Sequence, residues 1–288
     1  MYCPQTAENS APLFDYSRWK SELPDLAKQY ASNHPLPHVL IQDFLDDRLA
    51  HAVAEEFPLV GSRAWIQYKH PNERKLGLVR REKFPARLGE IVDELNSPRF
   101  LNWLSQLTGI PDLIADPSLE GGGLHQSMRG GYLNLHTDFS HHHHRKDWKR
   151  RINLILYLNP GWEAEWGGEI EFWDAGMQRC LVKYPPALNH ALIFNTDERY
   201  FHGFPEPVSC PESHSRKSLA LYYYTLEKNA RNTPRSTNYR SRPEDGIGKS
   251  ALIWLDKQAV DFYSRAKTRF GFSDEFASKV LGLISGKK

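Results

Sequence analysis

The chain has 288 residues, 40% of them hydrophobic and 12% aromatic, and a formal net charge of +2. A chain of this size can bury a substantial core, and its near-neutral charge gives no global signal for binding a polyanion. Cys3, Cys180 and Cys210 are odd in number and follow no pattern, which favours a reducing compartment over a disulfide framework. Residues 1–12 contain neither a basic nor an apolar leader segment, and no uncharged apolar run approaches membrane-spanning length. We therefore expect a cytoplasmic protein without a membrane span.

Residues 1–120 are dominated by helical patterns. Helices are predicted over Tyr16–Tyr30, Asp46–Phe57, Arg87–Leu95 and Phe100–Leu107, and a short strand over Val39–Ile41. Pro58 stops the second helix, and Gly109 with Pro111 stops the fourth. The segment from Trp65 to Arg81 is polar and basic. We expect the helices to buttress one sheet.

The pattern changes from about Leu124 to Leu226, where short apolar runs are separated by Gly, Pro and Asn clusters. This pattern predicts many strands in a sandwich or jelly roll, so the fold class is mainly β with flanking helices (α+β). From Lys228 onward, seven lysines and six arginines stand against six acidic residues, a net charge of +7. Asn229–Gly248 is predicted to be a loop, and Leu252–Phe270 and Asp274–Ile284 to be helices.

One short motif, His136-Thr137-Asp138, has the chemistry of a metal site. In a strand, side chains alternate between faces, so His136 and Asp138 point the same way. His202 follows the apolar strand Leu192–Phe194 and a turn, and it is predicted to supply a third ligand from a distant strand. Two imidazoles and one carboxylate form the ligand set of non-haem Fe(II) oxygenases.

Two other histidines compete with His202 for the third position. His190 stands at the start of the apolar run, where a structural or exposed role is favoured. His214 lies two residues before Arg216 and shares its strand face, which is too close for one to serve the metal and the other to serve a distant carboxylate. On the strand that carries Arg216, Ser218 and Tyr222, the guanidinium could form a two-pronged salt bridge with the carboxylate of a cosubstrate.

The ordered set of motifs resembles the catalytic core of the Fe(II)/2-oxoglutarate dioxygenases, and within them the prolyl 4-hydroxylase-like branch. The resemblance covers roughly residues 120–226. Its elements are the HxD…H triad, Tyr157-Leu158-Asn159 with Trp162, Gly167-Gly168-Glu169-Ile170, Pro186 before Asn189 and Phe194, and Arg216 with Ser218. It implies a double-stranded β-helix (jelly roll, cupin-like) in residues 120–226. We expect residues 1–226 to form one catalytic domain and residues 227–288 to form a basic extension packed on the same domain.

The resemblance also implies the cofactors and the site. Fe(II) would be held by His136, Asp138 and His202, with 2-oxoglutarate and O2 as cosubstrates and succinate and CO2 as products. Arg216 would bind the distal carboxylate of 2-oxoglutarate, with Ser218 and Tyr157 as hydrogen-bond donors to the same group. Asn134, Asn153 and Tyr132 are further candidates for contacts with cosubstrate or substrate. Relatives that halogenate have a small residue at the position of Asp138, so hydroxylation is favoured, although desaturation and ring closure use the same triad.

Two basic segments near the motif have open roles. The run His141–His144 is flanked by polar residues and is predicted to be a solvated loop, with substrate contact by one histidine as the alternative. The arginines of the C-terminal loop, Arg231, Arg235, Arg240 and Arg242, suit anionic or sugar groups, so this loop is a candidate substrate lid; a solvated face is the alternative.

The substrate is not encoded in the motifs. A small polar or anionic metabolite, or a sugar conjugate, is the leading expectation, and a prolyl or other protein side chain is the alternative. A non-catalytic metal-binding β-helix protein is the competing class. Nucleic acid is not expected, because no recognisable binding module is present, and the oligomeric state is not encoded.

Overall fold

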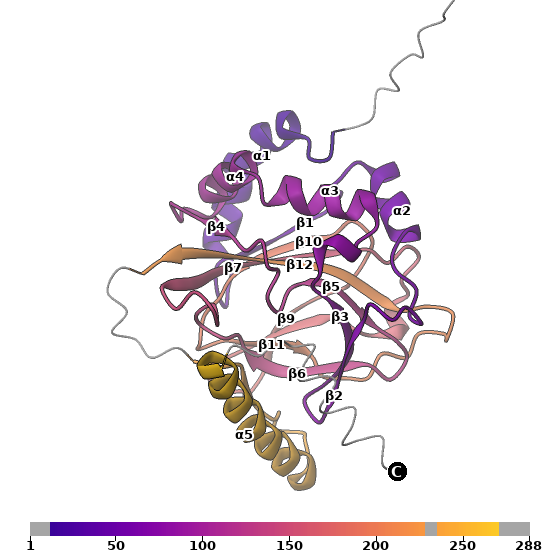
Figure 1. Cartoon of the computed structure of the whole chain (residues 1–288), viewed down its shortest axis with the longest axis vertical. Coiled ribbons are helices and arrows are strands. Elements are labelled where there is room, and N and C mark those ends of the chain that lie inside the picture. Colours follow the sequence, from indigo (N-terminus) through magenta and orange to yellow (C-terminus); the bar gives the residue numbers. More distant parts are fainter. Residues whose placement is uncertain (1–11, 228–234, 271–288) are drawn as a thin grey trace, which may run out of the picture.

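One curved antiparallel sheet forms the body of the molecule (Figure 1). The structure is a computed structural model that describes residues 12–227 and 235–270, with side chains as far as residue 259. Within these residues the strands are β1 (His38–Ile41), β2 (Ile66–His70), β3 (Glu73–Leu78), β4 (Ile114–Ala115), β5 (Gly123–Ser127), β6 (Tyr132–Thr137), β7 (Trp148–Tyr157), β8 (Ile170–Trp173), β9 (Cys180–Tyr184), β10 (Ala191–Asn195), β11 (Phe201–Phe204), β12 (Arg216–Leu226) and β13 (Asn238–Tyr239). They pair in the order β1-β10-β7-β12-β5-β3-β6-β11-β8-β9, with β2, β4 and β13 attached at the sides. The sheet bends into a nearly closed barrel, which confirms the predicted jelly roll.

The described helices are α1 (Tyr16–Ser32), α2 (Asp47–Glu55), α3 (Ala86–Leu95), α4 (Pro98–Thr108) and α5 (Ile247–Phe270), with single 3-10 turns η1 (Arg81–Lys83) and η2 (Ala164–Trp166). The four predicted N-terminal helices are confirmed within about two residues at each end. Local chemistry sets these ends: the side chain of Ser97 accepts the N–H of Phe100 at the start of α4, and Gly109, at φ +69°, ends it.

The polar segment that follows α2 is more ordered than its composition suggests. It forms the hairpin β2–β3, and β3 then pairs with both β5 and β6. The strand pattern could not be recognised in the sequence, because charged residues occupy buried positions of β3. Glu73 is buried and forms an ion pair with Lys75, 3.0 Å away.

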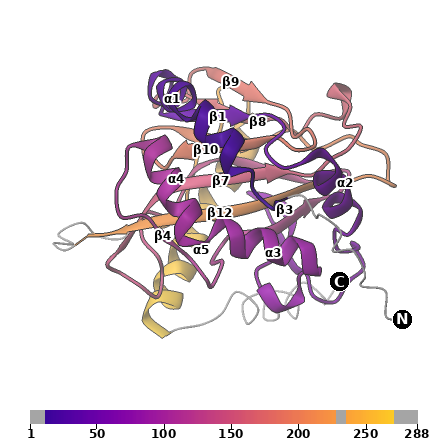
Figure 2. The same cartoon turned by 90° about the horizontal axis from the view of Figure 1, so that it is seen from above.

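Helices α1 to α4 cover one face of the sheet, over β1, β10, β7 and β12 (Figures 1 and 2). Alternate residues of β12 divide between two environments. Leu219, Leu221 and Tyr223 belong to the core beneath the helices, and the opposite parity, which includes Arg216 and Ser218, faces the interior of the barrel. The sequence alternation thus builds an apolar layer on one side and a polar chamber on the other.

The C-terminal part returns to the barrel at the end away from α1 to α4 (Figure 1). β13 lies within the segment predicted to be a loop, and it pairs with β6. The helix expected from Leu252 begins earlier, at Ile247. Cys3, Arg231 and the predicted helix Asp274–Ile284 lie outside the described residues. None of the described helices has the length and apolar character needed to cross a bilayer.

Candidate active site

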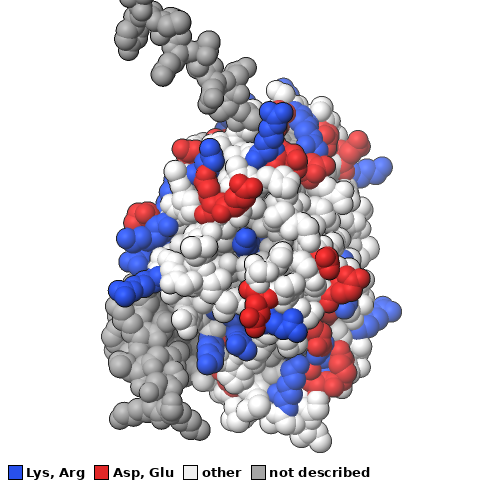
Figure 3. Space-filling view, turned by 90° about the vertical axis from the view of Figure 1, so that its right-hand side faces the viewer, with Lys and Arg blue, Asp and Glu red and all other residues white. Residues whose placement is uncertain are grey.

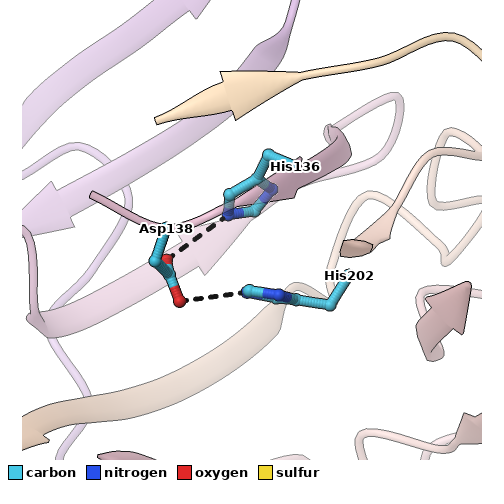
Figure 4. A group of neighbouring side chains, drawn as sticks. All are labelled: His136, Asp138 and His202. Carbon is cyan, nitrogen blue, oxygen red and sulfur yellow. Dashed lines mark ion pairs between the residues drawn. The ribbon is translucent and has the colours of Figure 1, made fainter. Parts of the chain in front are cut away.

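Three side chains meet inside the barrel (Figure 4). His136 lies on β6 and Asp138 just after it, while His202 lies directly opposite His136 on β11. The two imidazole rings are 4.5 Å apart between centroids. The Asp138 carboxylate bridges them, with Oδ1 3.7 Å from His136 Nε2 and Oδ2 3.5 Å from His202 Nε2. The candidate ligand atoms all lie within 4.8 Å of one another.

The protonation of this triad suits a divalent metal. His136 Nδ1 donates to the carbonyl of Asn134 at 2.9 Å, which leaves Nε2 unprotonated and available as a ligand. Burial lowers the pKa of His136, and it lowers that of His202 to about 3. Burial alone would raise the pKa of Asp138, but the guanidinium of Arg150 and the hydrogen bond from Asn153 hold it well below its usual range. At neutral pH the site therefore presents two neutral imidazoles and one carboxylate, which Fe(II) requires.

Two residues of β7, Arg150 and Asn153, contact the Asp138 carboxylate. Asn153 Nδ2 donates to Asp138 Oδ2 at 2.7 Å, and Arg150 Nη2 lies 3.3 Å from Oδ1. Arg150 also donates twice to Asn153 Oδ1, at 2.9 and 2.7 Å, and stacks 3.4 Å above the ring of Tyr222. Asn153 was a candidate for contact with cosubstrate or substrate, and in the structure its amide hydrogen-bonds to Asp138 at one end and to Arg150 at the other. Sequence reasoning missed Arg150, which lies between Lys149 and Arg151 in the basic start of β7 and so gives no distinct signal.

Arg216 is a buried cation whose side chain has no carboxylate partner among the described residues. It is 6% exposed, and burial lowers its pKa. Its Nε donates to the carbonyl of Gly168 at 2.6 Å, its Nη2 donates to the hydroxyl of Tyr157 at 3.4 Å, and the guanidinium stacks 4.1 Å from the ring of Phe204. A buried charge of this kind is costly unless it is paired. The carboxylate of a bound dicarboxylate would supply the missing partner, so the donor set fits 2-oxoglutarate.

Neighbouring residues shape this pocket around Arg216. Gly168 adopts φ +77°, which favours glycine, and a Cβ there would stand 3.0 Å from Arg216 Cδ, so a larger residue would also displace the arginine side chain. Ser218 lies directly opposite Tyr157 in the pairing of β12 with β7, and both are buried. The predicted grouping of Arg216, Ser218 and Tyr157 is therefore present in the structure, and their binding of 2-oxoglutarate stays a prediction.

The remaining candidates, Asn134 and Tyr132, hydrogen-bond to the turn between β2 and β3. Asn134 Nδ2 donates to the carbonyl of Pro71 and to the side chain of Asn72, at 3.1 and 3.2 Å. The Tyr132 hydroxyl lies 3.3 Å from the carbonyl of His70. These bonds fasten β6 to the β2–β3 turn, so the two residues brace the strand that carries His136.

The competing histidines stand outside the triad. The group of possible metal ligands found among the described residues contains His202 and neither His190 nor His214. The ring of His214 packs 4.8 Å from that of Trp166.

The prediction of a solvated loop at His141–His144 is wrong for its first half. His141 and His142 are each only 4% exposed. His141 Nε2 lies 2.9 Å from Glu227 Oε2, and His142 Nε2 lies 3.5 Å from Asp116 Oδ1. The acidic partners come from distant parts of the chain, so the sequence pattern gave no sign of them. These contacts fix the path of the backbone immediately after Asp138.

The basic C-terminal loop lies beside the triad, but most of its described arginines are occupied. Arg235 pairs with Glu198, and Arg242 pairs with Glu206 and Asp245. Arg240 stacks over the ring of Phe201 at 5.2 Å. The position of the loop is consistent with a wall of the site. The positive charges of Arg235 and Arg242, however, are neutralised by Glu198, Glu206 and Asp245.

Fold and triad together define a double-stranded β-helix oxygenase. Residues 122–224 match the family model described as the 2OG-Fe(II) oxygenase superfamily. Comparison with curated proteins gives no match. Residues 122–224 are a domain of the 2OG-Fe(II) oxygenase superfamily, as the sequence resemblance implied, and this match supports a 2-oxoglutarate-dependent dioxygenase with Fe(II), 2-oxoglutarate and O2 as its cofactor and cosubstrates.

Three solved structures of similar fold are prolyl hydroxylases. The enzyme from Trichoplax adhaerens, solved with a peptide fragment of a hypoxia-inducible factor, is 16% identical, with a TM-score of 0.52 over 77% of this chain and 96% of that one. The Pseudomonas putida prolyl-4-hydroxylase is 16% identical, with a TM-score of 0.51 over 71% and 100%. A Phytophthora capsici prolyl 4-hydroxylase is 18% identical, with a TM-score of 0.50 over 94% and 80%. At these identities the likeness establishes a shared fold.

Proposed function

We propose that this dioxygenase hydroxylates an unactivated C–H bond, with His136, Asp138 and His202 as the metal ligands and Arg216 as the anchor of 2-oxoglutarate. Fe(II), together with 2-oxoglutarate and O2, supplies an oxidant strong enough for such a bond, and the cosubstrate is converted to succinate and CO2. The observation that carries the proposal is the meeting, in one barrel, of the His/Asp/His group with a buried guanidinium that lacks a carboxylate partner among the described residues.

The chain's own residues prepare the site for this reaction. Arg150 and Asn153 keep the Asp138 carboxylate ionised and fixed in orientation. Arg216 and Tyr157 would hold the far end of 2-oxoglutarate, which leaves its other end directed toward the triad. Because Asp138 offers a carboxylate where a halide would otherwise bind, hydroxylation is the expected outcome rather than halogenation.

A prolyl residue in a peptide is the substrate that the fold favours. The three solved structures described above are prolyl hydroxylases, and they match this chain over most of their own length. A small polar or anionic metabolite, or a sugar conjugate, was the leading expectation from the sequence, and the arginine-rich loop suited such groups. That argument is weakened, because Arg235 and Arg242 are paired with acids of the chain itself. The face drawn in Figure 3 mixes Lys and Arg with Asp and Glu, so this face presents no field of one sign to an anionic partner.

Succinate formation and product mass test the proposal together. The purified chain is incubated with Fe(II), 2-oxoglutarate, O2 and a set of proline-containing peptides, with the Asp138→Ala variant as control. We expect succinate from the unmodified chain and a peptide heavier by one oxygen atom on proline. Succinate without peptide oxidation would reject the prolyl substrate alone. Metal binding without any succinate would reject the enzyme and favour a metal-binding protein without turnover.

A further inference from the structure

The strand that carries His136 has a neighbour from the far end of the chain. β13 pairs with β6 so that Tyr239 stands directly opposite His136. On its other side His136 faces His202 of β11. Directly opposed residues on neighbouring strands share a face of the sheet, so these three residues form one row across three strands. The C-terminal segment therefore lies against the candidate metal ligands.

Tyr239 packs on the imidazole of His136. It is 6% exposed, and its ring lies 5.4 Å from that of His136, with an angle of 39° between the ring planes. It also meets the ring of His70 edge-on at 6.3 Å. The imidazole of His136 is thus held at Nδ1 by the carbonyl of Asn134 and on its ring by Tyr239. These two contacts limit the rotation of the imidazole and so fix the direction of Nε2.

Backbone hydrogen bonds hold β13 in this place on both sides of Tyr239. The N–H of Arg240 donates to the carbonyl of Leu135 at 3.0 Å. At the other end, the N–H of Ser140 donates to the carbonyl of Arg235 at 3.0 Å, and the N–H of Arg235 donates to the Ser140 hydroxyl at 2.9 Å. The segment therefore runs beside β6 and beyond Asp138.

Helix α5 is docked on the β2–β3 turn by a buried polar contact. Asp256 Oδ2 accepts from Asn72 Nδ2 at 2.7 Å and lies 2.6 Å from His70 Nδ1. Asn72 Nδ2 also donates to the carbonyl of Ile253 at 3.2 Å. The carbonyl of Asn72 in turn accepts the N–H of Asn134, two residues before His136. A continuous set of contacts thus joins α5, the hairpin and the strand of the first metal ligand.

We infer that Tyr239 is a positioning residue for His136. The C-terminal segment from residue 235 to 256 completes the metal site because it holds Tyr239 against the imidazole of His136. Tyr239 does not belong to the His/Asp/His group and acts through the imidazole. Residues behind metal ligands orient them, and their loss typically lowers metal affinity about 10- to 100-fold. The inference rests on the metal site proposed above.

Cobalt(II) is the probe, because it binds the same kinds of ligand and its visible absorption reports ligand geometry. We expect Tyr239→Ala to weaken Co(II) binding about 10- to 100-fold and to change the absorption spectrum. Tyr239→Phe, which keeps the ring, should restore both. Tyr16→Ala, which removes a ring that packs against Phe14 and Arg99 in the helical layer, is the control and should leave Co(II) binding unchanged. Circular dichroism checks that each variant is folded.

A second variant tests the docking of α5 without touching Tyr239. Asp256→Ala removes the acceptor of Asn72 and His70, and it should weaken Co(II) binding in the same direction. If folded Tyr239→Ala binds Co(II) as the unmodified chain does, or if Tyr239→Phe is as weak as Tyr239→Ala, the positioning role is wrong. Unchanged Co(II) binding by Asp256→Ala would overturn the part assigned to α5. If the unmodified chain itself does not bind Co(II), the proposed metal site fails and the inference fails with it.

Discussion

Replacement of Arg216 by methionine should separate the stability of the protein from its function. The structure places a guanidinium in the barrel without a carboxylate partner among the described residues. Such a charge strengthens the binding of an anionic ligand, but its burial lowers the free energy of unfolding of the ligand-free protein. We therefore expect Arg216→Met to abolish the response to 2-oxoglutarate while the ligand-free protein becomes slightly more stable.

The magnitude follows from the contacts of the guanidinium. Burial of an ion costs several kcal/mol. The hydrogen bond from Nε to the Gly168 carbonyl offsets about 2 kcal/mol of this cost, and the stacking on Phe204 offsets about 1 kcal/mol. Methionine fills a similar space without the charge, so the free energy of unfolding should rise by about 1 kcal/mol, which corresponds to roughly 2–4 °C. Loss of the ion pair with the ligand should weaken 2-oxoglutarate binding by about 3–5 kcal/mol, or more than about 100-fold.

Thermal unfolding with and without 2-oxoglutarate measures both effects. With Co(II) in the site and 2-oxoglutarate at about 100 times its Kd, the unmodified protein should gain about 2.7 kcal/mol, and Arg216→Met should gain less than about 0.4 kcal/mol at the same concentration. Arg199→Met, whose side chain is 67% exposed, is the matched control and should respond normally. A ligand-free Arg216→Met protein that is clearly less stable would refute the reasoning about the unpaired charge. A full response to 2-oxoglutarate would refute the role of Arg216.

Three other changes test the triad. Asp138→Ala should abolish succinate and product formation, because the metal loses its anionic ligand; turnover at the original rate, measured by succinate release, would contradict this. Asn153→Leu should weaken Co(II) binding about 10- to 100-fold in titrations, since Asp138 loses its hydrogen-bond donor, and an unchanged Kd would show that Arg150 alone suffices. Co(II) binding should persist as the pH falls to about 5, because the folded pKa of His202 is about 3, far below the 6.5 of a free imidazole. The same depressed pKa makes folding stability decrease as the pH falls from about 6.5 toward 3, and a loss of metal with a midpoint near pH 6.5 would argue against buried neutral ligands.

The metal ligands were predictable from the sequence because their geometry is local. Side-chain alternation in one strand places His136 and Asp138 on one face. The order of the later motifs singled out His202 and Arg216. The apolar runs of β10 and β12 were equally visible, because their pattern does not depend on which strands become neighbours.

The supporting residues were not predictable, because their roles arise from pairing between distant strands. Arg150 gains its role when β7 places it next to the residue after β6. His142 is buried because Asp116 lies beside it in the fold. The two-residue strand β13 is too short to leave a pattern, so the contact of Tyr239 with His136 appears only in the structure.

The charges gathered in the barrel predict that the metal and the cosubstrate bind better together than apart. The charges of Arg150 and Asp138 lie 3.3 Å apart and cancel each other. Together with Arg216, the three groups therefore carry a net charge of +1. A divalent cation alone makes the interior still more positive, whereas 2-oxoglutarate carries two negative charges that offset it. Because charges in a buried site are weakly screened, we expect saturating 2-oxoglutarate to tighten Co(II) binding about tenfold or more, which is about 1.4 kcal/mol. Coupling between ligands is reciprocal, so Co(II) must tighten 2-oxoglutarate binding by the same factor. Calorimetric titration in both orders measures the coupling, and equal affinities with and without the other ligand would show that the charge of Arg216 does not act on the metal.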